Sequence, residues 1–271
     1  MAKVFVAAQD LVNEDIVLID ARYNLADQEE GRQLYNNGHI DEALHWDLTQ
    51  DLSDRNKEQS GRHPMPEKQQ LQALFQRSGL QLEDAIVIYD QGGAPFATRA
   101  YYLLTYAGFP NVRVVEDGMN GLLAAGFEFN AKKVEKHPTK LNLNWQDDLY
   151  VNLAYVKEVT EGQHDKVLLD ARAHNRYIGL VEPMDPIAGH IPGARNFDWE
   201  QLAKEGRLFA NDALQKVVNP AEKIIVYCGS GVSASPVFAA LTELGYEHIQ
   251  LYTGSYSEWV AHYPIATGEE R

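Results

Sequence analysis

The chain has 271 residues, 45% of them hydrophobic and 23% charged, a composition typical of a globular protein with room for one large or two small domains. Its single cysteine excludes an intrachain disulfide and any all-thiolate zinc site. A formal net charge of −15 argues against a nucleic-acid partner, so an anionic substrate would need local donors that act against the overall field.

The N-terminus lacks the features of a targeting segment. Met1 to Val6 carries one lysine and a short apolar run, and polar and acidic residues follow, so neither the apolar core nor the cleavage site of a secretory signal is present. No run reaches the roughly 18 apolar residues of a membrane span. We therefore predict a cytoplasmic protein with no membrane partner.

The first half of the chain alternates strand-like and helix-like patterns. Short apolar runs predict buried strands, and segments with apolar residues on one side predict helices. In chain order these are a strand over 16–20 that runs into Asp20-Ala21-Arg22, a Gly38-His39-Ile40 turn, a helix within 66–80, a strand over 85–89 that ends at Asp90, a helix over 96–106, and a strand over 112–115.

The second half repeats this order. Asp170-Ala171-Arg172 matches Asp20-Ala21-Arg22, and Gly189-His190-Ile191 matches Gly38-His39-Ile40. The strand over 224–227 matches the strand before Asp90, which places Cys228 where Asp90 stands. Matches in one order along the chain indicate a duplicated α/β domain with a mainly parallel sheet flanked by helices. We predict domains at 1–130 and 149–271, joined by a polar linker at 131–148.

Cys228 lies at the carboxyl end of its predicted strand, where folds of this class bind ligands. The loop that follows, Gly229-Ser230-Gly231-Val232-Ser233, runs into a helix that begins near Ala234 and ends by Gly245. Glycines let backbone N–H groups turn inward, and the helix N-terminus adds partial positive charge. Both effects favour a thiolate, which is the nucleophilic form of cysteine.

With these motifs the chain resembles the tandem-domain rhodaneses, the thiosulfate and 3-mercaptopyruvate sulfurtransferase family. The resemblance covers nearly the whole chain. It depends on the two Asp-Ala-Arg strand ends, on Gly-His-Ile-Pro-Gly-Ala at 189–194, and most specifically on Cys-Gly-Ser-Gly-Val-Ser-Ala at 228–234.

The resemblance implies an inactive first domain and an active second domain that works through a Cys228 persulfide. The donor would be a small anionic sulfur compound, and the acceptor would be cyanide, a thiol or a thioredoxin-like dithiol. No metal or organic cofactor is implied. Because Asp90 cannot form a persulfide, we expect the first half to be a scaffold and part of the cleft wall.

Candidate substrate-binding residues follow from the same resemblance. Arg176 matches the family's substrate-binding arginine and would hold a donor oxygen. The loop residues Gly229, Ser230, Gly231, Val232 and Ser233 would surround the sulfur. We expect Arg172 and Asp170 to form a structural pair, and His190 to fix packing. His39 matches a histidine proposed to act in the mercaptopyruvate subgroup, but we read it too as a packing residue.

The loop composition favours one donor. Positions 229 to 233 contain no cation, which resembles the mercaptopyruvate type rather than the thiosulfate type. The position of a second arginine in that subgroup is Met184. We therefore predict a preference for mercaptopyruvate with a weak KM, and measurable use of thiosulfate.

Three other functions compete with that of a sulfurtransferase. A cysteine phosphatase needs Cys-x5-Arg, and Ala234 stands where that arginine would be. A papain-like hydrolase needs a specific histidine partner, which the sequence cannot place. A non-catalytic sulfur-carrying or regulatory binding module stays open as the alternative, and a turnover assay separates it from the enzyme.

Overall fold

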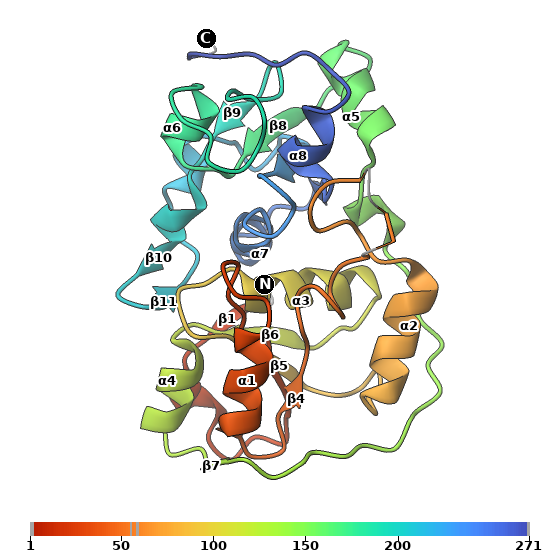
Figure 1. Ribbon diagram of the computed structural model, residues 1–271, viewed down its shortest axis with the longest axis vertical. Helices are drawn as coiled ribbons and strands as arrows, with labels where there is room; N and C mark the ends of the chain where they lie inside the picture. The colour runs from red at the N-terminus through yellow and green to blue at the C-terminus, as the bar shows by residue number, and fades with distance from the viewer. Residues whose placement is uncertain (1–2, 55, 58–59, 270–271) are drawn as a thin grey trace.

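The computed structural model describes residues 3–54, 56–57 and 60–269. It divides into two α/β halves stacked along the long axis, the first half at the bottom of Figure 1 and the second at the top. Among these residues no helix has the length and apolar character needed to cross a membrane.

The first half is built on a five-stranded parallel sheet in the order β1-β6-β5-β2-β4. Its elements are β1 (Phe5–Val6), the 3-10 helix η1 (Ala8–Leu11), β2 (Val17–Asp20), α1 (Glu30–Asn37), β3 (His39–Ile40), β4 (Leu44–His45), α2 (Lys68–Arg77), β5 (Ile86–Tyr89), α3 (Phe96–Tyr106), β6 (Val112–Val115), α4 (Gly118–Ala124) and β7 (Phe129–Asn130). β3 and β7 form a separate antiparallel pair.

The second half has a four-stranded parallel sheet in the order β13-β12-β8-β9. Its elements are η2 (Asp147–Leu149), α5 (Leu153–Thr160), β8 (Val167–Asp170), α6 (His174–Tyr177), β9 (Arg195–Asn196), η3 (Trp199–Leu202), β10 (Ala203–Lys204), β11 (Arg207–Leu208), η4 (Leu214–Lys216), β12 (Ile224–Tyr227), α7 (Ser235–Glu243), β13 (Ile249–Leu251) and α8 (Ser255–Trp259). β10 and β11 pair as an antiparallel hairpin.

The two sheets confirm the predicted fold class. β12 lies between β13 and β8 as β5 lies between β6 and β2, so Cys228 and Asp90 follow equivalent central strands. The apolar runs Ile86–Tyr89 and Ile224–Tyr227 are buried at every position, as expected for strands covered on both faces.

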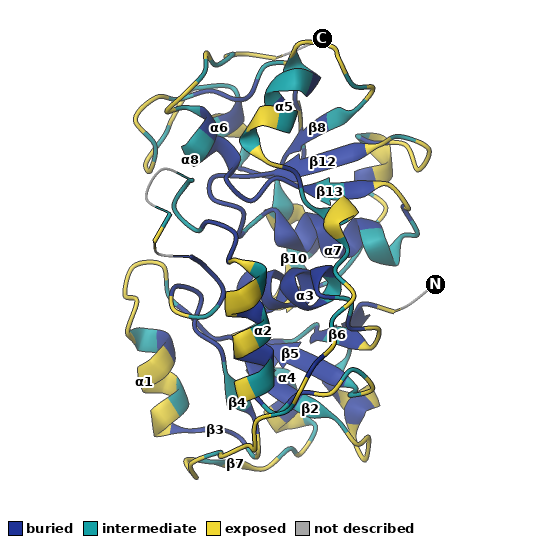
Figure 2. Ribbon diagram, turned by 90° about the vertical axis from the view of Figure 1, so that its right-hand side faces the viewer, coloured by how far each residue is buried: buried dark blue, intermediate teal, exposed yellow. Residues whose placement is uncertain are grey.

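The halves share one hydrophobic core. α3 packs against α7, with the rings of Tyr102 and Phe238 meeting edge to face at 5.1 Å, and one cluster of buried apolar residues includes Ile86 and Leu104 together with Val226 and Cys228. Figure 2 shows both helices buried in the centre of the molecule. Residues 131–146 form no helix or strand and run along the outside from β7 to η2 (Figure 1).

Segments cross the boundary in both directions. The tip of the β10–β11 hairpin covers the loop after β5: an added Cβ at Gly92 would lie 2.6 Å from the Gly206 carbonyl oxygen. In return, Gly61 and Arg62 of the first half lie against α8, where the Arg62 N–H donates to Ser257 Oγ at 3.2 Å. Each half therefore supplies a cover for the other half's central loop.

Candidate active site

Cys228 is the buried residue directly after β12, with a side chain 1% exposed. Its sulfur accepts a hydrogen bond from the Gly231 N–H at 3.1 Å and lies 3.9 Å from Ser255 Oγ. The Cys228 N–H donates to the same Ser255 oxygen at 3.1 Å. The backbone N–H of Gly231 thus points at the sulfur, which suits an anionic sulfur species, while the Ser255 hydroxyl donates to the Tyr252 carbonyl oxygen at 2.8 Å.

Two features of backbone geometry hold this arrangement. Gly231 has φ +77, a conformation that favours glycine, and an added Cβ would collide with the Thr253 carbonyl oxygen. Ser255 is a buried non-glycine residue with φ +56. Such residues cluster at functional sites. Sequence analysis did not identify Ser255, because its role depends on a contact between α8 and the Cys228 loop.

Ser230 contacts a histidine from the other half. Its Oγ lies 2.9 Å from His63 Nδ1, and either atom can donate, depending on the imidazole tautomer. Burial lowers the pKa of His63 to about 4, with further lowering by Arg99 and Arg62, so the ring is neutral at pH 7. No motif of the sequence points to His63, because it lies in Gly61-Arg62-His63-Pro64, a segment outside the repeated motifs.

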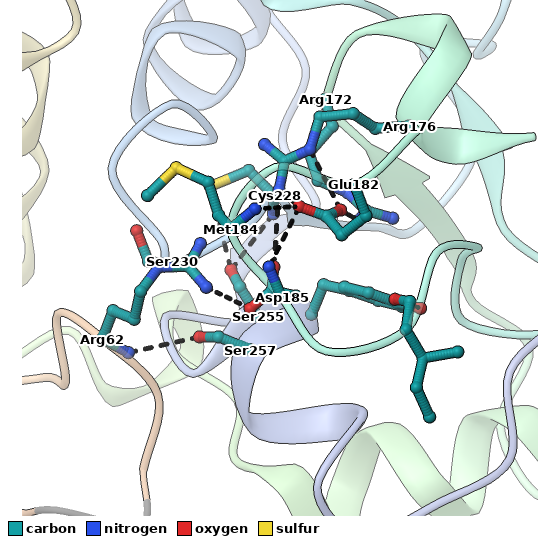
Figure 3. A network of polar contacts seen from close by, with 12 residues as sticks. Arg62, Arg172, Arg176, Glu182, Met184, Asp185, Cys228, Ser230, Ser255 and Ser257 are labelled. Atoms are coloured by element: carbon teal, nitrogen blue, oxygen red, sulfur yellow. Dashed lines mark hydrogen bonds and ion pairs between the residues drawn. The ribbon is translucent and has the colours of Figure 1, made fainter. Parts of the chain in front are cut away.

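Two arginines from different halves converge on Gly229, the residue after the cysteine. An added Cβ there would lie 2.8 Å from Arg62 Nη2, 3.4 Å from Arg176 Nη2 and 3.6 Å from Arg176 Nη1. Figure 3 shows Arg62 reaching toward this region from the orange ribbon of the first half. Arg176 was predicted, and Arg62 was not.

Carboxylates hold the outer edges of both guanidinium groups. Arg62 Nη1 pairs with Asp185, while Arg176 pairs with Glu182 at 2.6 Å and with Asp185 at 3.4 Å (Figure 3). Burial raises the pKa of Glu182, but the Arg176 hydrogen bond and other contacts outweigh it, and the net pKa lies below the ordinary value. Among the described residues Arg62 Nη2 and Arg176 Nη1 have no partner, so both remain available to a donor anion.

Arg172 forms the predicted pair with Asp170, and its Nη1 also donates to Glu182, the carboxylate that holds Arg176, at 3.2 Å. Its guanidinium pairs with Asp170 at 2.6 Å, donates to the Gly189 carbonyl oxygen at 2.6 Å, and stacks 3.9 Å from the Tyr256 ring. Arg22 repeats the first two contacts with Asp20 and the Gly38 carbonyl oxygen. A contact present in both halves cannot explain why only one of them carries a cysteine.

The remaining predicted residues lie at different places. Val232 is buried and Ser233 is half-buried in the loop, and no side-chain hydrogen bond involves either residue in the described part of the chain. Met184 is half exposed beside Arg62 and lines an open pocket of about 530 Å³ with Asp185 and Ser257. A larger pocket of about 770 Å³ lies at the amino ends of β8 and β12, on the opposite edge of the sheet from Cys228.

His39 lies in β3, on the far side of the first sheet from the cysteine loop. Its ring stacks on Tyr35 at 3.9 Å, and its Nδ1 contacts the Tyr35 carbonyl oxygen at 2.9 Å. The stacking supports the packing role expected for His39, which stays a prediction. The histidine beside the cysteine loop is His63.

The first half, which we expected to be a scaffold and part of the cleft wall, places Arg62 and His63 beside the Cys228 loop. Asp90 itself stays apart from them. Its carboxylate accepts the N–H groups of Gly92 at 2.8 Å and Ala97 at 3.1 Å, and is 3% exposed. Burial raises the pKa of Asp90 to about 6.

The family model for the rhodanese-like domain matches residues 6–125 and 154–262. The chain is 34% identical over 273 residues to a probable 3-mercaptopyruvate sulfurtransferase of Pseudomonas aeruginosa, covering 97% of this chain and 96% of that protein. It is 31% identical over 265 residues to the 3-mercaptopyruvate sulfurtransferase of Escherichia coli, covering 94% and 92%, and 35% identical over 253 residues to the putative thiosulfate sulfurtransferase SseB of Mycobacterium tuberculosis, covering 91% and 88%.

Solved structures of similar fold point to the same family as the sequence comparisons. SseA from Escherichia coli, described as a 3-mercaptopyruvate sulfotransferase with the rhodanese fold, superposes with a TM-score of 0.81 at 29% identity, covering 95% of this chain and all of that one. The 3-mercaptopyruvate sulfurtransferase from Leishmania major superposes with a TM-score of 0.83 over 96% of this chain and 74% of that one, at 24% identity, which supports the fold alone.

Proposed function

The chain belongs to the rhodanese family and is a sulfurtransferase, and from this premise we propose that it transfers a sulfane sulfur through a persulfide on Cys228. The donor is 3-mercaptopyruvate or thiosulfate, and the acceptor is cyanide, a thiol or a thioredoxin-like dithiol. The observation that carries the proposal is the Cys228 sulfur, hydrogen-bonded by the Gly231 N–H at 3.1 Å beside two converging guanidinium groups.

In the first step the Cys228 thiolate attacks the donor's outer sulfur. With thiosulfate, the donor S–S bond breaks, sulfite leaves with the electron pair, and the enzyme carries Cys–S–S⁻. With mercaptopyruvate, the C–S bond breaks, the carbanion is stabilised as the pyruvate enolate, and a proton is taken up to give pyruvate. The Gly231 N–H is placed to stabilise the sulfur anion in both cases.

The acceptor then restores the thiolate. Cyanide attacks the outer sulfur of the persulfide, the S–S bond breaks, and thiocyanate leaves while Cys228 keeps the electron pair. No net oxidation or reduction of the protein occurs over the cycle with cyanide. A dithiol acceptor instead takes the sulfur and releases it as hydrogen sulfide when its own disulfide forms.

Donor recognition is assigned to Arg176 and Arg62. Their unpartnered N–H groups face Gly229, where a donor carboxylate or sulfonate oxygen would lie when its sulfur reaches Cys228. Ser230, hydrogen-bonded to the neutral His63, supplies a hydroxyl for the donor ketone or leaving group. We keep mercaptopyruvate as the preferred donor, while Arg62 offers a second cation that the expectation of a weak KM did not include.

Intact-mass measurement tests the mechanism directly. Incubation with either donor should add one sulfur atom to the protein, and subsequent cyanide should remove it and release thiocyanate. If the mass does not change while turnover proceeds, transfer does not pass through a protein persulfide. A stable added sulfur without steady-state turnover would instead support the non-catalytic sulfur-carrying module.

A further inference from the structure

Arg99 is a fully buried arginine of α3 in the first half. The described part of the chain contains two other buried arginines, and each pairs with an aspartate: Arg22 with Asp20 and Arg172 with Asp170. Arg99 has no carboxylate within ion-pair distance among the described residues. A buried cation without an opposite charge is costly, so its retention needs a reason.

Within the described part of the chain, every hydrogen bond of the Arg99 side chain goes to a backbone carbonyl oxygen. Nε and Nη2 donate to Leu52 at 3.3 and 3.1 Å, Nη2 donates to His63 at 3.2 Å, and Nη1 donates to Gly231 at 3.3 Å. His63 contacts Ser230, and Gly231 donates its N–H to the Cys228 sulfur. The guanidinium therefore joins the two segments that approach the cysteine from opposite halves.

The charge of Arg99 also bears on the cysteine. Burial lowers the pKa of Arg99 to about 10, and the facing Cys228 and tyrosine groups act in the opposite sense. The negative charge is on Cys228 Sγ in the thiolate and on the outer sulfur, one bond away, in the persulfide anion. An anion that is present in both resting forms of the enzyme suits a fixed cation in a dry environment.

We propose that Arg99 is a positioning residue of the active site: it is the fixed counter-charge of the Cys228 sulfur anion and holds the Gly231 N–H against it. The proposal rests on the proposed function, because it takes Cys228 as the reacting group. The positive charge that balances the Cys228 sulfur anion thus comes from Arg99 of the first half, the half that has no nucleophile.

Other charged and titratable groups also face this region. They are His63, Tyr102 and Tyr150, the pairs of Arg62 with Asp185 and of Arg176 with Glu182, and the pair of Arg172 with Asp170. The arginines in the last three pairs are balanced by carboxylates, so the loss of Arg99 should dominate any change in the field at the sulfur.

The test uses the single thiol of the chain. Cys228 is the only cysteine, so its rate of alkylation by iodoacetamide can be followed against pH without a donor or acceptor. In Arg99→Met, which keeps an apolar side chain of similar length, the midpoint of that profile should move up by about one pH unit, and the rate at neutral pH should fall roughly tenfold. Arg99→Lys keeps the charge, so its midpoint should move by less than half as much.

Two further variants make the result decisive. Arg99→Gln is also neutral but retains N–H groups for the carbonyl oxygens, and should shift the midpoint as Arg99→Met does, which keeps the test available if the methionine variant fails to fold. Arg22→Met removes a buried arginine of the same half and should lower thermal stability without moving the midpoint. If neither neutral variant moves the midpoint, the proposal is overturned, whatever happens to turnover.

The assay also separates this proposal from the proposed function. A shifted alkylation midpoint supports the counter-charge even if the protein never carries a persulfide. Addition of one sulfur atom to the parent protein, with an unshifted midpoint in the neutral variants, would support the function and reject the role of Arg99.

Discussion

The loops after β5 and β12 begin from the same strand position and use their backbone N–H groups differently. In the first domain the Asp90 carboxylate accepts the Gly92 and Ala97 N–H groups and so fills its own loop. In the second domain the Gly231 N–H is turned toward the Cys228 sulfur. The inert loop is closed by its own side chain, whereas the active loop directs its N–H group at a reactive atom.

The covers of the two loops differ as well. The tip of the β10–β11 hairpin places the Gly206 backbone on Gly92 and Gly93, and the guanidinium of Arg207 in that tip is paired with Glu116. The segment over Cys228 brings Arg62 and His63. Duplication therefore left one domain without a nucleophile but with side chains that complete the other domain's site, and the variants below test this division.

Replacement of the nucleophile should have the largest effect. Cys228→Ser keeps the size of the side chain but removes the thiolate, so donor treatment should add no sulfur and sulfur transfer should be abolished. Intact mass and thiocyanate release measure the two outcomes. In the matched variant Asp90→Cys/Cys228→Ser, we expect no recovery, because the backbone of Gly206 covers the first loop. Turnover in either variant would contradict the division between the domains.

Loss of Arg62 should have the next largest effect. Arg62→Met removes a charged hydrogen-bond donor to the substrate anion, which should cost about 1.5–3 kcal/mol, or roughly one to two decades in kcat/KM. Met184→Arg adds a cation to the same pocket and should restore part of the loss, more for mercaptopyruvate than for thiosulfate.

The control for this pair is Arg195→Met. Arg195 pairs with Glu222 on the surface, so its loss changes the net charge equally without touching the site. Rates for both donors in the parent also test donor choice. If thiosulfate is used better than mercaptopyruvate, or if Met184→Arg leaves mercaptopyruvate use unchanged in the Arg62→Met background, the assignment of these residues to the donor carboxylate is wrong.

Replacement of His63 should reduce kcat/KM less than loss of Arg62 does. It should also change how the free energy of unfolding depends on pH below 7. His63→Gln can still hydrogen-bond Ser230, so kcat/KM should fall only a few-fold, against about tenfold in His63→Ala, which loses that bond. Because the folded pKa is lowered from 6.5 to about 4, the stability linked to a neutral His63 is present above pH 6.5 and lost as the pH falls through 4.

The free energy of unfolding should therefore decline between pH 7 and pH 4 by about 3 kcal/mol more in the parent than in His63→Gln. Urea denaturation at several pH values measures this difference. Parallel pH profiles for the two proteins would contradict a buried, neutral His63.

Asp90 should have the smallest effect on chemistry and the opposite pH dependence. Its pKa is raised from 3.8 to about 6, so the stability it contributes is present below pH 3.8 and lost as the pH rises through 6. Relative to Asp90→Asn, the parent should lose about 3 kcal/mol of unfolding free energy across that range. The kcat of a folded Asp90→Asn should stay within about twofold, and a larger loss would mean that the first loop takes part in the chemical step.

The sequence predicted most of the fold and half of the site. The strands Ile86–Tyr89 and Ile224–Tyr227, the helix Phe96–Tyr106 and the mainly parallel sheets follow from local apolar patterns and from the repeat. The position of Cys228 follows from the same patterns, since a strand end is a local property. The predicted domain boundaries and the roles of the loop residues stay predictions.

What could not be predicted depends on contacts between the halves. Arg62 and His63 lie between β4 and α2, outside the repeated motifs, and no periodicity shows that this segment reaches the other domain. The sequence shows Arg99 within an apolar helix but not what its side chain contacts. Its contact with the Gly231 carbonyl oxygen exists only because α3 packs against the Cys228 loop. Ser255 likewise depends on how α8 meets β12.

The core shared by α3 and α7 has a consequence for the integrity of the enzyme. Its apolar residues come from both halves, so neither half can expose its side of the interface to water without loss of hydrophobic free energy. The external segment 131–146 packs on the first half, where Leu141 belongs to the same buried cluster and the Trp145 ring lies 5.4 Å from that of Tyr106. The two halves therefore resemble the subunits of a heterodimer: a buried apolar interface holds them together in addition to the chain that joins them.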